Sequence, residues 1–111
     1  MNNKERIITL LQFARKANKL VHGFDSCCRM LQMRKLDLLL LASDTADNTK
    51  KKIDSMIKEY DAKTPLIVIS NQEELGRLLN LPATALLGIK DKGFANKIKE
   101  YWFADSMMEE N

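Results

Sequence analysis

The 111-residue sequence is poor in the side chains on which most catalytic and metal sites depend. It has one histidine, His22, and two cysteines, which are adjacent at Cys27 and Cys28. One histidine excludes a His-based metal cluster and leaves little choice of general base. On a helix, adjacent residues point ~100° apart, which is poor geometry for two thiolates on one metal ion. We therefore expect no metal site and no cofactor.

Glycine is also scarce, and Gly76, Gly88 and Gly93 are isolated in the sequence. Neither the Walker phosphate loop nor the dinucleotide-binding G-x-G-x-x-G pattern occurs. The adjacent cysteines are interpreted as core residues and not as nucleophiles, because no third orienting group accompanies them. These absences favour a binding module over an enzyme.

Long apolar runs are missing as well, and the longest, at 38–42, has the length of a strand. A membrane-spanning helix needs roughly 20 apolar residues, so we expect no membrane span. The N-terminus leads into an amphipathic pattern and not into a signal-peptide core. Adjacent cysteines do not close a structural loop, which fits a reducing compartment. We expect a cytoplasmic protein.

The charge is unevenly distributed along the chain. Residues 1–60 carry 12 Lys and Arg against 7 Asp and Glu, whereas residues 61–111 carry 6 against 8. A basic front half and an acidic tail favour a polyanionic partner for the front half. Solvated helix faces are the alternative interpretation of the same charges.

Apolar spacing alternates between helical and strand patterns along the whole chain. Helical stripes occur at 7–17, 25–33, 53–60, 75–79 and 94–102, and apolar strand-like runs occur at 20–21, 38–42, 66–69 and 85–89. Continuous apolar strands are typical of sheets covered on both faces. We predict an α/β fold, a three-layer α/β/α sandwich around a small mixed four-stranded sheet. Residues 1–103 would form one domain, and residues 104–111 a mobile acidic tail.

Polar residues at the ends of these segments predict helix caps. Asp25 or Ser26 is expected to cap the second helix, and Ser70 with Glu73 to form a capping box. Asn80 stands where the fourth helix must end, a position that often needs a left-handed backbone. Asp91 is expected to cap the last helix.

The stretch 19–29 predicts a strand that turns at Gly23 into a helix with free N–H groups at its start. Such an end suits an anion such as a phosphate. The preceding helix places Arg15, Lys16 and Lys19 on one polar face, which adds positive charge directly before the turn. By itself a turn of this kind is more often structural than functional.

The order of these elements, with the runs 14–23, 41–53, 74–77 and 91–95, resembles the ribosomal L-seven-Ae/L-thirty-e superfamily of RNA-binding proteins. Within it the chain is most similar to the small bacterial YlxQ-type members. The resemblance covers roughly residues 4–99. It implies an RNA-binding protein, ribosome-associated or bound to another structured RNA, that acts as a monomer and also meets protein partners.

Members of the superfamily with known targets bind kink-turns, sharply bent internal loops flanked by sheared G·A pairs. Their recognition loop, Gly-x-Asn-Glu-x-x-Lys, aligns with Gly23 to Arg29, so Asp25 and Ser26 stand where the family has Asn and Glu. Their second contact is an apolar loop. The resemblance thus implies RNA-binding residues in three groups, which are Arg15, Lys16 and Lys19; Gly23, Phe24, Asp25, Ser26 and Arg29; and Leu81, Pro82 and Ala83. The alternative is a protein-interaction module that keeps the fold without kink-turn specificity.

Overall fold

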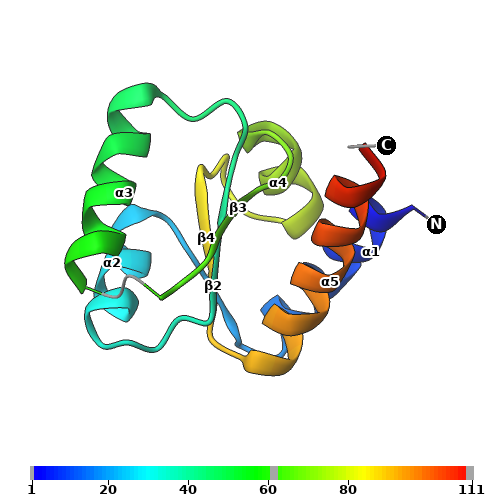
Figure 1. Cartoon of the computed structure of the whole chain (residues 1–111), viewed down its shortest axis with the longest axis horizontal. Coiled ribbons are helices and arrows are strands. Elements are labelled where there is room, and N and C mark those ends of the chain that lie inside the picture. The colour runs from blue at the N-terminus through cyan, green and yellow to red at the C-terminus, as the bar shows by residue number, and fades with distance from the viewer. Residues whose placement is uncertain (1, 61–62, 110–111) are drawn as a thin grey trace.

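The computed structural model describes residues 2–60 and 63–109, in which five helices alternate with four strands (Figure 1). In chain order they are α1 (Asn3–Lys16), β1 (Leu20–His22), α2 (Phe24–Gln32), β2 (Leu38–Leu41), α3 (Asp47–Tyr60), β3 (Leu66–Val68), α4 (Gln72–Leu79), β4 (Leu86–Ile89) and α5 (Lys92–Glu109). None of these helices is both long enough and apolar enough to cross a membrane.

The four strands form one mixed sheet in the order β1-β4-β2-β3. Strand β4 is antiparallel to both of its neighbours, and β2 is parallel to β3. Strands β1, β2 and β3 therefore run in one direction. Their carboxyl ends meet the start of β4 at one edge of the sheet, and we call this the carboxyl edge.

Side chains of the central strands alternate between two cores, one on each face of the sheet. Leu38 and Leu40 pack with α1, α4 and α5, whereas Leu39 and Leu41 pack with α2 and α3. Figure 1 shows the sheet between these two groups of helices. The predicted three-layer sandwich with a mixed four-stranded sheet is confirmed, because the period-two pattern of strands buries apolar residues on both faces.

The edge strand β3 is less covered than its apolar sequence predicts. Ile67 is buried, but 47% of Val68 is exposed. Strand β3 lies at the edge of the sheet and has a neighbouring strand on one side only. Its apolar sequence does not indicate which of its side chains a helix covers. The expectation that this strand is covered on both faces is wrong at Val68.

Two of the four predicted caps are confirmed. Asn80 ends α4 with φ 56° and ψ 48°, in the left-handed region, and the Asp91 carboxylate accepts a hydrogen bond of 2.8 Å from the Phe94 N–H at the start of α5.

The other two predicted caps are wrong. Helix α2 starts at Phe24, earlier than expected, with Gly23 as its N-cap, so neither Asp25 nor Ser26 caps it. At α4 the capping residue is Asn71, whose side chain accepts from the Glu74 N–H. The predicted capping box of Ser70 and Glu73 is therefore not formed, and the Ser70 hydroxyl instead donates to the Glu74 carboxylate.

The last helix extends further than its apolar stripe predicts. It continues through Glu109, and Asp105 accepts a hydrogen bond of 2.8 Å from the Asn3 side chain. The expected boundary between residues 103 and 104 therefore falls inside α5. Residues 110 and 111 of the predicted acidic tail lie outside the described residues, and the mobility of the tail stays a prediction.

Candidate nucleic-acid interface

The turn from β1 into α2 has an open helix N-terminus. Gly23 has φ 90° and ψ 157°, and no side chain of the described residues accepts a hydrogen bond from the first N–H groups of the helix. The Gly23 carbonyl accepts the first helical bond, from the Cys27 N–H at 3.1 Å. A Cβ built on Gly23 meets nothing within 4 Å, so the space beside its backbone is open. Free N–H groups with the helix dipole behind them are suited to bind an anion.

The loop after α4 reaches the same edge of the sheet. The Leu81 N–H donates to the Gly76 carbonyl at 2.8 Å, which folds the chain back over α4. Pro82 and Ala83 are exposed, whereas Leu81 is half-buried and packs against the core on the α1 side. Of the three predicted loop contacts, Pro82 and Ala83 thus present accessible apolar surface, and Leu81 serves mainly to pack the loop.

One carbonyl joins the glycine turn to this loop. The Leu86 oxygen accepts from the Gly23 N–H at 2.9 Å and from the Thr84 hydroxyl at 3.3 Å. The Ala85 oxygen accepts from the Ala42 N–H at 2.8 Å, so the loop is held between the ends of β1 and β2. The Gly23 turn and the Leu81–Ala83 loop, separated by more than fifty residues of sequence, are brought together at the carboxyl edge.

The basic residues of α1 are distributed over two places. Arg15 donates to the Asn80 carbonyl at 3.4 Å, and Lys16 lines the same shallow hollow beside Asn80. Both residues therefore lie where the loop begins. Lys19 is at the opposite edge, since its carbonyl accepts from the Lys90 N–H after the end of β4. An extended strand advances ~3.3 Å per residue, which puts Lys19 about 13 Å from Gly23. The predicted basic face is thus split, and Lys19 is not brought to the Gly23 turn.

Arg29 and Asp25 lie on one exposed face of α2. They are four residues apart, so their side chains point in similar directions one turn from each other. Both are exposed, whereas Phe24 and Ser26 are half-buried. Helix α2 thus exposes one charge of each sign on this face, with Asp25 in its first turn and Arg29 in its last.

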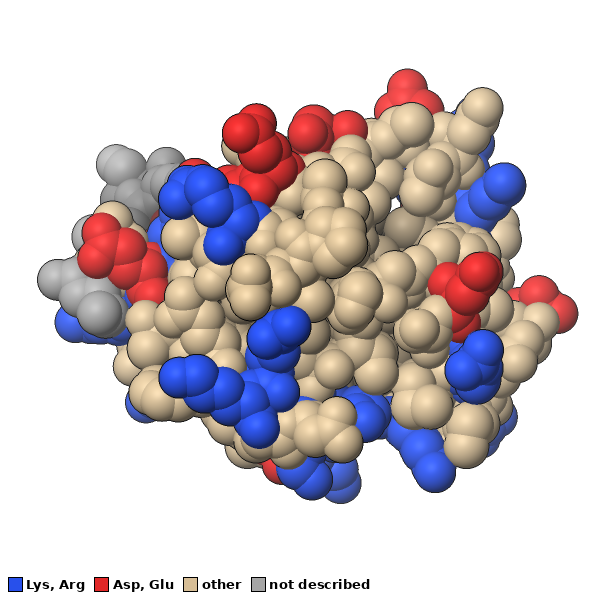
Figure 2. Space-filling view, turned by 180° about the vertical axis from the view of Figure 1, so that it is seen from behind, with Lys and Arg blue, Asp and Glu red and all other residues tan. Residues whose placement is uncertain are grey.

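The surface of the molecule has a charge asymmetry. In the face shown in Figure 2, Asp and Glu gather mainly along the upper rim, and Lys and Arg side chains are spread over the lower part. The carboxyl edge is toward the top in Figures 1 and 2, so most of this basic region lies toward the opposite ends of the strands. The whole chain carries a formal charge of +3. A basic region of this kind attracts polyanions from solution.

Gly76 supports the loop, and sequence reasoning did not assign it a role. A Cβ on Gly76 would lie 2.8 Å from the carbonyl oxygens of Leu81 and Pro82. Only glycine allows the loop to pass this close to α4. The available signal was an isolated glycine inside a helical pattern, which is unfavourable unless packing requires it.

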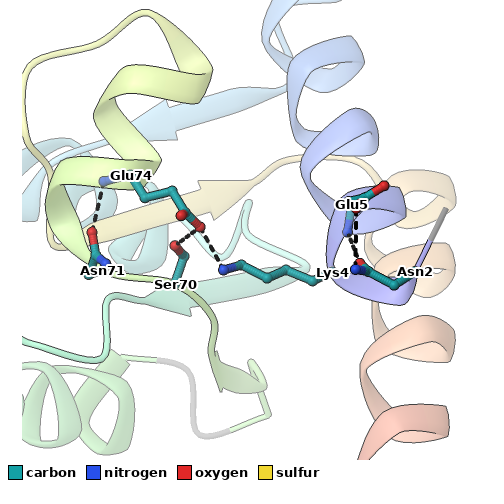
Figure 3. A network of polar contacts seen from close by, with 6 residues as sticks. All are labelled: Asn2, Lys4, Glu5, Ser70, Asn71 and Glu74. Atoms are coloured by element: carbon teal, nitrogen blue, oxygen red, sulfur yellow. Dashed lines mark hydrogen bonds and ion pairs between the residues drawn. The ribbon is translucent and has the colours of Figure 1, made fainter.

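A polar network also joins α1 to the start of α4 (Figure 3). The Lys4 ammonium lies 2.7 Å from the Glu74 carboxylate, which also accepts from the Ser70 hydroxyl. The hydrogen bond from Lys4, followed by that from Ser70, lowers the pKa of Glu74. The Gln12 side chain donates to the Leu78 carbonyl at 3.0 Å. This bond and the Lys4–Glu74 ion pair connect both ends of α4 to α1.

Neither cysteine is disulfide-bonded. Cys27 is buried, and burial together with the neighbouring Cys28 raises the pKa of its thiol to about 12. A thiol with that pKa stays protonated near neutral pH and is a poor nucleophile. Within the described part of the chain, no three His, Cys, Asp or Glu side chains are grouped so that they could hold a metal ion.

Comparisons with known proteins identify the family. RNA-binding protein YlxQ of Bacillus subtilis (strain 168) is 33% identical over 89 residues, which cover 80% of this chain and 87% of that protein. RNA-binding protein YlxQ of Enterococcus faecium is 29% identical over 98 residues, which cover 88% and 92%. Both relatives are named as binding proteins and not as enzymes.

Solved structures show the same fold. A Bacillus halodurans protein of unknown function superposes with a TM-score of 0.78 at 29% identity, covering 86% of this chain and 94% of that chain. The Giardia lamblia 15.5kD RNA binding protein shares the fold with a TM-score of 0.70 at 17% identity, covering 89% and 83%. A family model matches residues 5–99, nearly the whole domain, and the chain belongs to the Ribosomal protein L7Ae/L30e/S12e/Gadd45 family.

Proposed function

We propose that this protein binds a structured RNA of the kink-turn type at the carboxyl edge of its sheet. The observation that carries the proposal is the hydrogen bond from the Gly23 N–H to Leu86, which sets the open start of α2 beside the loop of Pro82 and Ala83. Membership of the family and the names of the relatives support the same ligand class.

In this proposal the backbone of α2 and the charge of Arg29 hold phosphates. The uncapped N–H groups after Gly23 donate to phosphate oxygens, and the absence of a Cβ at Gly23 lets the RNA backbone approach closely. Pro82 and Ala83 give a small apolar surface for an unstacked base. Phosphate contacts would position the RNA, and the few base contacts would specify it.

Asp25 has a separate role in the proposal. Its carboxylate accepts from a guanine amino group, where the family pattern has an Asn. Arg15 and Lys16 add phosphate contacts beside Asn80, and Lys19 contributes at most through long-range charge because it lies at the far edge. We also propose that the protein is a monomer and that it is cytoplasmic, and the two free thiols fit the reducing compartment.

The test compares three RNAs of equal length, a kink-turn, a straight duplex and a single strand, each titrated at low and physiological salt. We expect selective kink-turn binding by the wild-type chain. Arg29→Ala should weaken it about tenfold, because one charge-assisted phosphate contact is worth about 1.5 kcal/mol. Lys58→Ala, which removes an exposed charge from α3, should leave the affinity unchanged.

Equal and weak binding to all three RNAs that vanishes at physiological salt would contradict the proposal. So would equal losses in Arg29→Ala and Lys58→Ala, since net charge alone would then explain the binding.

A protein-interaction module is the second candidate, and exposed apolar side chains favour it. Phe103 is 52% exposed beside Trp102, with ring centroids 5.1 Å apart, and Trp102 donates to the carbonyl of the exposed edge residue Val68. Binding of a partner protein that persists after nuclease treatment and is lost in the Phe103→Ser variant would support this function over RNA binding.

A further inference from the structure

A groove of about 400 Å³ runs between α2 and α3 and adjoins the interface described above at Phe24. Its apolar wall consists of Phe24, Met56 and Tyr60, with the half-buried thiol of Cys28. These side chains present flat or polarisable apolar surface to the groove. Such a wall is suited to stacking, which is not specific for one base.

The groove continues directly from the Gly23 turn. Strands β1 and β2 are both antiparallel to β4, so they run in the same direction. The helices that follow them, α2 and α3, thus both start at the carboxyl edge. Phe24 is the first residue of α2 and lines the groove, so one end of the groove opens beside Gly23.

Charge along the groove changes sign from this end to the other. Lys51 and Lys52, both exposed, line it in the second turn of α3, and the acidic Glu59 lines it near the end of that helix. At 1.5 Å per residue, Glu59 lies about 11 Å further along the axis than the two lysines. The groove is therefore basic where it meets the Gly23 turn and acidic at its far end, so an anionic chain would enter from the turn and extend only a short way.

We propose that this groove is a second RNA subsite, which takes one or two unpaired nucleotides that extend the RNA bound at the Gly23 turn. A base stacks on Phe24 above Cys28, and the adjoining phosphate lies between Lys51 and Lys52. This inference rests on the proposed function. It adds a subsite for single-stranded nucleotides to a site for a folded RNA.

The experiment uses the same kink-turn RNA with and without three unpaired uridines, added at the 5′ end of one probe and the 3′ end of another. We expect one of the two extensions to raise the affinity of the full chain about tenfold, as stacking of one base does in other proteins. Lys51→Gln/Lys52→Gln should lose this gain and bind the unextended RNA as the wild type does. The matched control Lys58→Gln/Lys99→Gln removes two charges elsewhere and should keep the gain.

Cys28 provides a second readout that does not depend on affinity. It lines the groove, whereas Cys27 is fully buried, so N-ethylmaleimide should label Cys28 alone in the native chain. We expect the extended RNA to slow this labelling severalfold at saturation, and the unextended RNA to leave it unchanged.

The two proposals fail in different ways. Tight binding of unextended RNA with no gain from either extension and no protection of Cys28 would overturn the subsite and leave the proposed function intact. The subsite would also be overturned if the extension raised the affinity of Lys51→Gln/Lys52→Gln as much as that of Lys58→Gln/Lys99→Gln. Absence of binding by any of the RNAs would overturn both.

Discussion

At Gly23 the backbone has φ 90° and ψ 157°, a combination that residues with a Cβ adopt only at a cost. Space is not the constraint, since nothing lies within 4 Å of the point that a Cβ would occupy. The conformation is needed because Gly23 alone connects β1 to α2. The Gly23 N–H donates to the Leu86 carbonyl, and α2 begins at the next residue. At the residue scale, a single glycine thus sets both the direction of α2 and the access to its N–H groups.

Gly23→Ala should therefore destabilise the fold by about 1–3 kcal/mol, the usual cost of a strained backbone residue. Kink-turn affinity should fall further than stability explains, because relaxation of the strain turns the first N–H groups of α2 away from their ligand. Urea unfolding gives the first quantity and titration of the folded variant the second. A variant as stable as wild type would show that the left-handed turn is not required.

Helices α1 and α4 lie side by side, and their contacts control where the loop of Pro82 and Ala83 lies. Gln12 and Arg15 donate to carbonyls at the end of α4, and Lys4 meets Glu74 near its start. The loop itself rests on α4 at Gly76. At the scale of elements, the loop is positioned by a helix pair and not by its own sequence.

Gly76→Ala should displace this loop, because its Cβ would lie 2.8 Å from two backbone oxygens that cannot move independently. Overpacking of this kind costs about 1–3 kcal/mol. We expect thermal unfolding to shift downward and kink-turn affinity to fall. Gly93→Ala is the control at an exposed helical position. Its Cβ would lie 3.1 Å from the Asp91 carboxylate, a side chain that can move, so it should change stability less than Gly76→Ala does. Equal effects of the two substitutions would contradict the close approach at Gly76.

The link between α1 and α4 also predicts a pH dependence. The pKa of Glu74 is lower in the folded chain than its ordinary 4.5, chiefly through the hydrogen bond from Lys4. A carboxylate with a lowered folded pKa stabilises the fold above 4.5, and this contribution disappears as the pH falls through the lowered value.

Glu74→Gln should consequently lower the melting temperature slightly at pH 7, and the difference from wild type should shrink as the pH falls below 4.5 and through the lowered pKa of Glu74. The effect is small because Lys4 is exposed. Melting curves of both proteins over this pH range test it, and a constant difference between them would exclude titration of Glu74 as the cause.

Charge is the property of the whole molecule that bears on function. The basic front half includes α1, α2 and α3, which lie on the two faces of the sheet. Three candidate phosphate contacts, Arg15, Lys16 and Arg29, predict that log affinity falls with log salt at a slope of about −3.

Arg29→Ala should reduce that slope by about 1, whereas Lys99→Gln, on the far side of the sheet, should leave it unchanged. Filter binding over a salt series measures both slopes. A slope near zero would mean that phosphate contacts do not drive binding.

Local sequence patterns were sufficient to predict the element types, the layers and two caps. Buried stripes follow helix and strand periods directly, and Asn80 and Asp91 act on backbone groups within a few residues of themselves. The caps of α2 and α4, which are Gly23 and Asn71, were predicted wrongly. Several adjacent residues can each cap a helix, and the register of the strand before the helix selects one of them.

The assembly of the site depends on contacts between distant parts of the chain. The bond from Gly23 to Leu86 and the groove between α2 and α3 each join segments more than twenty residues apart. Lys19 and Gly23 are only four residues apart in sequence, but they lie at opposite ends of β1 because the strand between them is extended. Periodicity describes which face of an element is buried, but not which elements become neighbours. That choice follows from how the sheet pairs and how both of its faces are covered.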